Sequence, residues 1–158
     1  EGTGKGTELR YHFLNLLKRF ENQVETPRAL RRANPLMLDE AVAAYSPYLF
    51  NLAWENIDTP GYISEKVLNA FLAGCIPIYW GTDDVMQYFN PKAMIAVKQF
   101  PSWREAARHV ADVYSNKTLQ DEYLREAPMT PEGLRKLFWY HDFGPNQTLN
   151  QVAEEESR

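Results

Sequence analysis

The sequence predicts an α/β domain in which helices cover a parallel β-sheet. Short apolar runs that are typical of buried strands occur at 48–54 (YLFNLAW), 76–80 (IPIYW) and 94–98 (MIAVK). Segments whose apolar residues recur at helical spacing precede, separate and follow these runs. Strands and helices that alternate in this order are typical of a parallel sheet with helices on its faces, a Rossmann-like arrangement.

The segments between the strands carry helix start and stop signals. The first helix is expected at 7–20, and a short second helix at 39–45. Between the first two strands, Ser64 can cap a helix that runs to about Ala73, and Gly74 suits its end. Further helix starts are expected at Gly81-Thr82 (with a helix through about Phe89), at Ser102 with Glu105, at Thr118, and at Thr130-Pro131.

The polar segments set the expected domain organisation. Residues 1–6 form a flexible lead-in, 7–143 one domain, and 144–158 a polar tail that we expect to be disordered. The segment 22–36 is polar, carries two prolines and three arginines, and is expected to be a connector. The chain begins at Glu1 without Met, so we expect it to be a piece of a longer protein.

Composition and charge exclude several classes of protein. The chain has 158 residues, 44% hydrophobic and 24% charged, which is ordinary for one globular domain. Its net charge of -4 argues against a partner that is duplex nucleic acid, because such proteins present a basic surface. Cys75 is the single cysteine, so no disulfide can form within the chain. No apolar run is long enough to span a bilayer.

The residues that follow the first strand form the richest candidate site. Ligands of open α/β sheets bind at the carboxyl ends of the strands, near helix N-termini. The segment 55–66 lies at such a place and offers Glu55, Asn56, Tyr62 and a helix start at Ser64-Glu65-Lys66. A lysine beside helix-start N–H groups favours a phosphate, and Glu65 could accept hydrogen bonds from sugar hydroxyls. The loop 81–84, after the second strand, is the other candidate place.

Local chemistry leaves a second interpretation of this segment open. Ser64 and Glu65 are residue types that helix starts favour in any protein, and Lys66 is then a solvated side chain. The three histidines, His12, His109 and His141, are too scattered to suggest a metal site.

Four stretches of the sequence resemble the donor-binding region of the α-1,3/1,4-fucosyltransferases, glycosyltransferase family ten. The family's pattern is roughly Tyr-Lys-Phe-x-x-x-Phe-Glu-Asn, then Gly-Tyr-Val-Thr-Glu-Lys, Ile-Pro-Ile-Tyr-x-Gly and Phe-Asn-x-x-Ser-Phe-Ile. The matching stretches are 48–56, 61–66, 76–81 and 89–95, in the same order and with similar spacing. The departures are mild: Trp54 replaces Phe, Ser64 replaces Thr, and Ala93-Met94 replaces Ser-Phe.

The resemblance implies the C-terminal, GDP-fucose-binding half of an inverting enzyme with the two-domain GT-B fold. It places Asn56, Tyr62, Glu65 and Lys66 on the family's donor-contacting positions, with Glu65 at the ribose and Lys66 at the diphosphate. Arg10, on the first helix, stands where the family has an arginine that completes the phosphate clamp. A planar, permanently charged guanidinium suits a diphosphate. The alternative for Arg10 is an exposed helix side chain.

The resemblance also implies a reaction. L-Fucose is transferred from GDP-β-L-fucose to a hydroxyl of an acceptor glycan, for which GlcNAc and an α-1,3 linkage are expected. The general base, a carboxylate, lies on the N-terminal acceptor domain in this family, so no catalytic residue is expected in this chain and the fragment is expected to be inactive alone. No metal or other cofactor is expected, because the cationic side chains can replace a metal ion and Asp83-Asp84 is interpreted as a helix start.

Two other functions are compatible with the sequence. One is a GT-B transferase domain for another GDP sugar, and the other is a non-catalytic nucleotide-binding module. The expected compartment depends on the source: the lumenal side of the Golgi membrane in a eukaryote, or the cytoplasm or inner membrane face in a bacterium.

Overall fold

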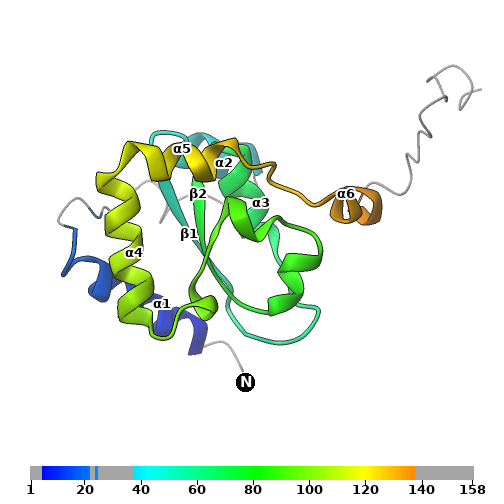
Figure 1. The fold of residues 1–158 in the computed structure, drawn as a ribbon. Helices are drawn as coiled ribbons and strands as arrows, with labels where there is room; N and C mark the ends of the chain where they lie inside the picture. The colour runs from blue at the N-terminus through cyan, green and yellow to red at the C-terminus, as the bar shows by residue number, and fades with distance from the viewer. Residues whose placement is uncertain (1–4, 22–23, 25–37, 138–158) are drawn as a thin grey trace, which may run out of the picture.

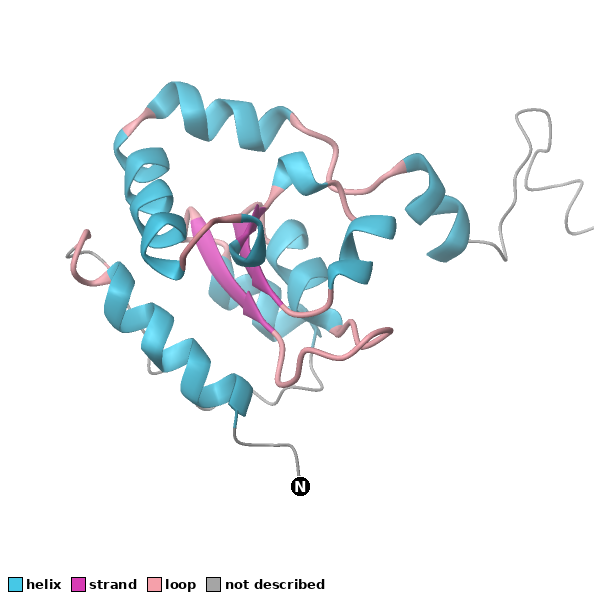
Figure 2. Cartoon of the chain, turned by 60° about the horizontal axis from the view of Figure 1, so that its bottom comes forward, coloured by secondary structure: helices cyan, strands magenta, loops and turns pink. Residues whose placement is uncertain are grey.

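A computed structural model of the chain describes residues 5–21, 24 and 38–137. Three strands form one parallel sheet in the order β1-β2-β3, with β1 at Phe50–Trp54, β2 at Ile76–Trp80 and β3 at Ile95–Ala96. Phe50 pairs with Ile76 at one end of the β1–β2 ladder and Trp54 with Trp80 at the other, so both strands end at the same edge. Helices cover the sheet on both faces, which confirms the predicted α/β architecture (Figures 1 and 2).

Most predicted helices are present with small shifts at their ends. The α-helices of the described residues are α1 (Lys5–Leu17), α2 (Leu38–Tyr45), α3 (Glu65–Leu72), α4 (Trp103–Ser115), α5 (Lys117–Arg125) and α6 (Pro131–Leu137). Ser64 caps α3 as predicted, and Gly74, just beyond its end, has a φ of 76° that favours glycine. Ser102 and Thr130 cap α4 and α6, since each hydroxyl accepts a backbone N–H three residues on.

Two local predictions are wrong, and a third is shifted by about one residue. The helix expected through Phe89 is a 3₁₀-helix, η2, at Asp83–Gln87. The strand expected at 94–98 is only β3, because the chain turns into a second 3₁₀-helix, η4 (Val97–Gln99). The start expected at Thr118 is capped by Asn116 instead, whose side-chain oxygen accepts the N–H groups of Thr118 and Leu119.

The lead-in, the connector and the tail that the sequence predicts fall wholly or mainly outside the described residues. Of these segments the structure describes only 5–6, which open α1, and Val24. No helix among the described residues has the length and apolar character needed to cross a membrane.

Alternation along the strands divides the core into two layers. One layer lies between the sheet and the pair α1 and α4, which stand side by side in Figure 1. Trp54 is its centre, fully buried, with ring centroids 5.1 Å from Phe13, 5.3 Å from Trp80 and 5.5 Å from Trp103. The second layer lies under α3 and η2, and its buried members are Ala53, Val67, Tyr79, Val85, Phe89 and Met94.

The packing around Trp54 generates a stability prediction. Trp54→Ala leaves a cavity between α1, α4 and the sheet, and is expected to lower the free energy of unfolding by about 3–5 kcal/mol. Tyr11→Ala is the control, because Tyr11 is 58% exposed on α1 and its loss should cost at most about 0.5 kcal/mol. Urea unfolding of the variants measures both. Equal midpoints for the two variants would contradict this account of the core.

Candidate functional site

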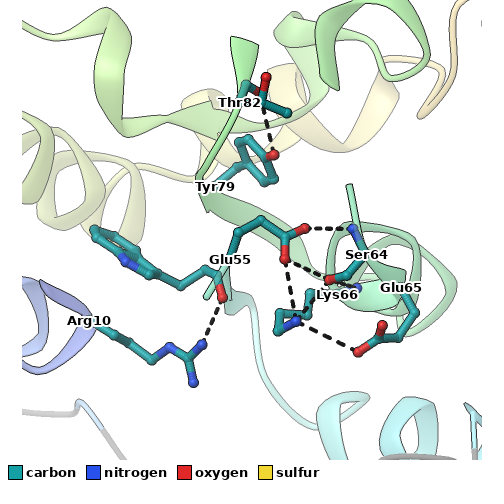
Figure 3. Close-up of polar contacts among 8 residues, drawn as sticks. Arg10, Glu55, Ser64, Glu65, Lys66, Tyr79 and Thr82 are labelled. Carbon is teal, nitrogen blue, oxygen red and sulfur yellow. Dashed lines mark hydrogen bonds and ion pairs between the residues drawn. The ribbon is translucent and has the colours of Figure 1, made fainter. Parts of the chain in front are cut away.

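The candidate site lies at the carboxyl ends of β1 and β2, where the loop 55–64 leads into α3. Glu55 comes directly after β1, and its backbone N–H donates to the carbonyl of Trp80 at 2.8 Å. This hydrogen bond continues the β1–β2 ladder by one residue and fixes Glu55 at the sheet edge. Figure 3 shows Glu55 between the start of α3 and the end of β1.

The carboxylate of Glu55 organises the start of α3. The residue is fully buried. One oxygen accepts the backbone N–H of Ser64 at 2.8 Å, and the other accepts the hydroxyl of Ser64 at 2.7 Å. The second oxygen also receives the ammonium of Lys66 at 3.3 Å (Figure 3). A buried carboxylate needs such partners, because removing it from water without them is costly.

Lys66 is held in place rather than solvated. Its side chain is 24% exposed. The ammonium donates to the hydroxyl of Ser64 at 2.8 Å and to Glu55, and it lies 3.8 Å from the carboxylate of Glu65. The interpretation of Lys66 as a solvated helix-start side chain is therefore wrong, although Ser64 does cap the helix, at 3.5 Å from the backbone nitrogen of Lys66.

Arg10 approaches the same strand end from α1. Its guanidinium donates to the carbonyl of Trp54 at 2.7 Å, and the backbone N–H of Gly6 donates to the carbonyl of Asn56 at 3.1 Å (Figure 3 shows the first of these bonds). A side chain at Gly6 would collide with the carbonyl of Asn56, so this close approach requires glycine. Arg10 is half-buried, and burial lowers its pKa from the usual value, which contradicts its reading as an exposed helix arginine.

The other predicted donor-contacting residues lie around this centre with fewer contacts. Asn56 is exposed and directly follows Glu55. Tyr62 is half-buried in the loop, where its N–H donates to the carbonyl of Thr59 in a turn. The side chain of Glu65 is 46% exposed. The structure therefore brings Arg10 and Lys66 to consecutive residues at the end of β1; the donor contacts themselves stay predictions.

The second candidate loop, 81–84, serves to hold the first. The carboxylate of Asp84 accepts the backbone N–H of Gly61 at 2.7 Å and the hydroxyl of Thr82 at 3.2 Å. Asp83 and Asp84 also open η2 behind the cap Thr82, as predicted. Its polar groups are thus largely used within the protein, and its contribution is to fix the loop 55–64.

A lysine that the sequence interpretation missed adds a second link between the loops. Lys98 donates to the carboxylate of Asp58 at 2.9 Å and lies 3.4 Å from the carboxylate of Asp83. Burial lowers the pKa of Lys98, but the hydrogen bond and charge of Asp58, with those of Asp83, outweigh it and leave the pKa above its usual value.

Tyr45 and the organising role of Glu55 also escaped the sequence interpretation. Tyr45 ends α2, and burial, with the nearby charge of Glu65, raises its pKa, while the charge of Arg10 lowers it. The charges of both Arg10 and Glu65 therefore act on Tyr45, which lies on a third helix, α2. Nothing in the sequence indicates that Tyr45 lies at the site. The position of Glu55 at the end of a strand indicates a site, but it does not indicate that the side chain is fully buried.

A pocket of about 660 Å³ opens beside Ser64 and Glu65, which both line it. Its wall is completed by residues of the loop, α3, η2 and α6, and the members are Gly61, Ile63, Ser64, Glu65, Leu68, Asp84, Gln87, Tyr88, Phe89 and Lys136. Arg10 and Lys66 do not line it. Ser64 and Glu65 line the pocket and also contact Lys66, so the pocket adjoins the site of the two cations.

The arrangement suits an anionic ligand. Two cations, Lys66 and Arg10, converge on the end of β1, and α3 presents the positive end of its dipole there. Two backbone N–H groups at this start, those of Ser64 and Lys66, are already paired within the protein. Among the residues that the structure describes, no cluster of His, Cys, Asp and Glu could hold a metal ion.

Fold and site together define the class of protein. A parallel α/β sheet with cationic groups at the carboxyl edge and at a helix start is typical of domains that bind nucleotides. The family Glycosyltransferase family 10 (fucosyltransferase) C-term matches residues 5–128 of the chain. The chain belongs to this family, which confirms the resemblance found in the sequence.

The relatives that this chain matches are several times longer than the matched region. An alpha-(1,3)-fucosyltransferase of Helicobacter pylori is 36% identical over 105 residues, which are 66% of this chain and 22% of that protein. A GDP-fucose protein O-fucosyltransferase 3 of Gallus gallus is 30% identical over 103 residues, 63% of this chain and 21% of its own length. The chain thus spans less than a quarter of these two relatives.

Solved structures agree with the sequence comparison. A crystal structure of an alpha1,3-fucosyltransferase with GDP-fucose superposes with a TM-score of 0.64 and 29% identity, and covers 80% of this chain and 37% of its own. A crystal structure of an alpha1,3-fucosyltransferase with GDP gives a TM-score of 0.65. The predicted fold of a fucosyltransferase C-terminal domain is therefore confirmed.

The crowded edge at Gly81 generates a second prediction. A Cβ at Gly81 would lie 2.6 Å from the hydroxyl oxygen of Tyr79 and 2.7 Å from Cγ of Glu55. Gly81→Ala is therefore expected to lower the free energy of unfolding by about 1–3 kcal/mol, measured by urea unfolding. Adding Tyr79→Phe, which removes one of the colliding atoms, should recover part of the loss. An alanine variant as stable as the parent would disprove the close packing.

Proposed function

We propose that this chain is the donor domain of a fucosyltransferase and seats the GDP of GDP-fucose at the start of α3. The observation that carries the proposal is the convergence of Arg10 and Lys66 on consecutive residues at the end of β1. These cations come from α1 and α3, which are separated in sequence by α2 and β1. Membership of the fucosyltransferase family supports the identity of the nucleotide sugar.

The proposed roles of the side chains follow from their chemistry. Lys66 and Arg10 contact the diphosphate, because both are cations at a place where an anion gains from the dipole of α3. Glu65 accepts hydrogen bonds from the ribose, and its exposed carboxylate at the first turn of α3 supports this. Asn56 and Tyr62 line the remaining wall of the donor site.

The proposed reaction is an inverting transfer. A hydroxyl of an acceptor glycan attacks the anomeric carbon of GDP-β-L-fucose, GDP leaves from the opposite face, and the product linkage is α. The transition state resembles an oxocarbenium ion, and negative charge grows on the departing diphosphate. Lys66 and Arg10 stabilise that charge electrostatically, and no metal or other cofactor is proposed to be required.

The acceptor and the base belong to the part of the proposal that lies beyond this chain. We propose GlcNAc as the acceptor sugar, in an α-1,3 linkage, with the general base on an N-terminal acceptor domain of the parent protein. The relatives include one named for α-1,3 transfer and one named for protein O-fucosylation, so an acceptor panel must contain both glycans and peptides. We propose the Golgi lumen as the compartment for a eukaryotic source, and the cytoplasm or inner membrane face for a bacterial one.

Binding of GDP tests the donor site directly. Calorimetry of the chain is expected to detect GDP and GDP-fucose and to give weaker binding for GDP-mannose and UDP-sugars. Lys66→Ala should weaken GDP binding about tenfold or more, because it removes a charged hydrogen bond to phosphate.

Lys117→Ala is the matched control for Lys66→Ala. Lys117 is exposed on α5 and pairs with Asp121, four residues on, so its loss should leave GDP binding unchanged. Equal GDP affinity in Lys66→Ala and in the parent would favour a non-catalytic module, and equal affinity for GDP-mannose would favour another GDP sugar as donor.

Turnover provides a separate prediction. The 158-residue chain alone should bind the donor but transfer no fucose, because we place the general base for the acceptor hydroxyl on the acceptor domain of the parent protein. The measurement is transfer of labelled fucose from GDP-fucose to a GlcNAc-containing glycan, with an intact family fucosyltransferase as the positive control. Transfer above the background rate would refute the assignment of the base to another domain.

A further inference from the structure

The proposed function assigns no role to the buried carboxylate of Glu55. We propose that Glu55 is a positioning residue that holds the ammonium of Lys66 where it meets the diphosphate. The inference rests on the proposed function. It adds a residue that acts on the donor through Lys66, directly and by way of Ser64, and does not touch the donor itself.

The contacts of Glu55 show why it can position a neighbour. The residue is fully buried, and its two carboxylate oxygens face Ser64 and Lys66 (Figure 3). The backbone of Glu55 is fixed by its bond to Trp80, and its Cγ packs against Gly81. A side chain held this firmly at its base and its tip can fix the atoms that bind to it.

The ammonium of Lys66 is held in a defined direction. An ammonium has three N–H donors. One donor points to Glu55 and one to the hydroxyl of Ser64, which itself donates to Glu55. Lys66 therefore completes a triangle of three groups. The carboxylate of Glu65 lies 3.8 Å from the ammonium, which is too far for a hydrogen bond, so the third donor can turn to a ligand. The side chain is 24% exposed, so that ligand can arrive from solvent.

A lysine that is not tethered would lose more freedom when it binds phosphate. Long flexible side chains lose rotamer entropy when a ligand fixes them, and preorganisation avoids that cost on binding. Ser64 and Glu55 impose this order on Lys66 before any ligand arrives. The tether therefore favours binding of the diphosphate, even though the charge of Glu55 by itself repels an anion.

These two effects of Glu55 have opposite signs, so a substitution separates them. Glu55→Gln keeps the shape but removes the charge. The amide nitrogen of glutamine is a donor and would face the donors of Ser64 or Lys66. If positioning dominates, Glu55→Gln weakens GDP binding. If the repulsion of the carboxylate dominates, Glu55→Gln strengthens it.

The test is a double-mutant cycle on the 158-residue chain with GDP as the ligand and calorimetry as the readout. Glu55→Gln is expected to weaken GDP binding about tenfold in the parent chain. In a Lys66→Met background it should change GDP binding less than about twofold, because the group through which Glu55 acts is gone. Glu132→Gln is the control, since Glu132 is an exposed carboxylate paired with Lys136 on α6.

The outcomes separate the inference from the proposed function. Equal or tighter GDP binding by Glu55→Gln overturns the inference, and so does an equal loss in both backgrounds, which is what a purely structural role would give. Absence of GDP binding by the unaltered chain overturns the proposed function and the inference with it. Binding that is weakened only when Lys66 is present supports the inference.

Ser64 provides a second route if Glu55→Gln does not fold. Ser64→Ala removes the hydroxyl that links Lys66 to Glu55, whereas Ser64→Thr keeps it. We expect weaker GDP binding for Ser64→Ala and recovery for Ser64→Thr. Equal GDP binding by the parent and both variants would overturn the tether.

Discussion

The candidate site depends on the interactions of the Glu55 carboxylate. It is a fully buried charge at the end of a strand, and its partners are the cap and the lysine at the start of α3. A buried charge without partners is strongly destabilising, so any movement of Ser64 and Lys66 away from Glu55 would cost stability. The same contacts therefore stabilise the fold and fix the geometry of the site.

A second constraint brings Arg10 to this set of contacts from a distant part of the chain. The core around Trp54 packs α1 against the sheet through Phe13, and Gly6 allows the first turn of α1 to touch the chain just after β1. Arg10 then reaches the carbonyl of Trp54. Aromatic packing thus sets how far a cation on one helix lies from a cation on another, which is what a two-cation phosphate site requires.

The sequence by itself determined the order of the strands and α-helices and the chemistry of the segment 55–66. Buried apolar runs gave β1 and β2 nearly to the residue, and Ser64 with Gly74 gave the ends of α3, because these signals are local. The four family stretches gave the family, since order and spacing of many residues are specific. The length of β3 was mispredicted, because pairing with a neighbour decides where a short strand ends. The helix expected after β2 is the 3₁₀-helix η2.

Only the tertiary structure decided which charged groups are buried and which of them meet. The residue type does not show that Glu55 is fully buried while Glu65 is exposed, although the side chains of both lie near Lys66 at the start of α3. Nor does it tell that Lys98 and Asp84 link the two loops, or that Tyr45 lies near Arg10 and Glu65. Burial and long-range pairing depend on how helices pack on the sheet, so residues far apart in sequence acquire a shared role only after folding.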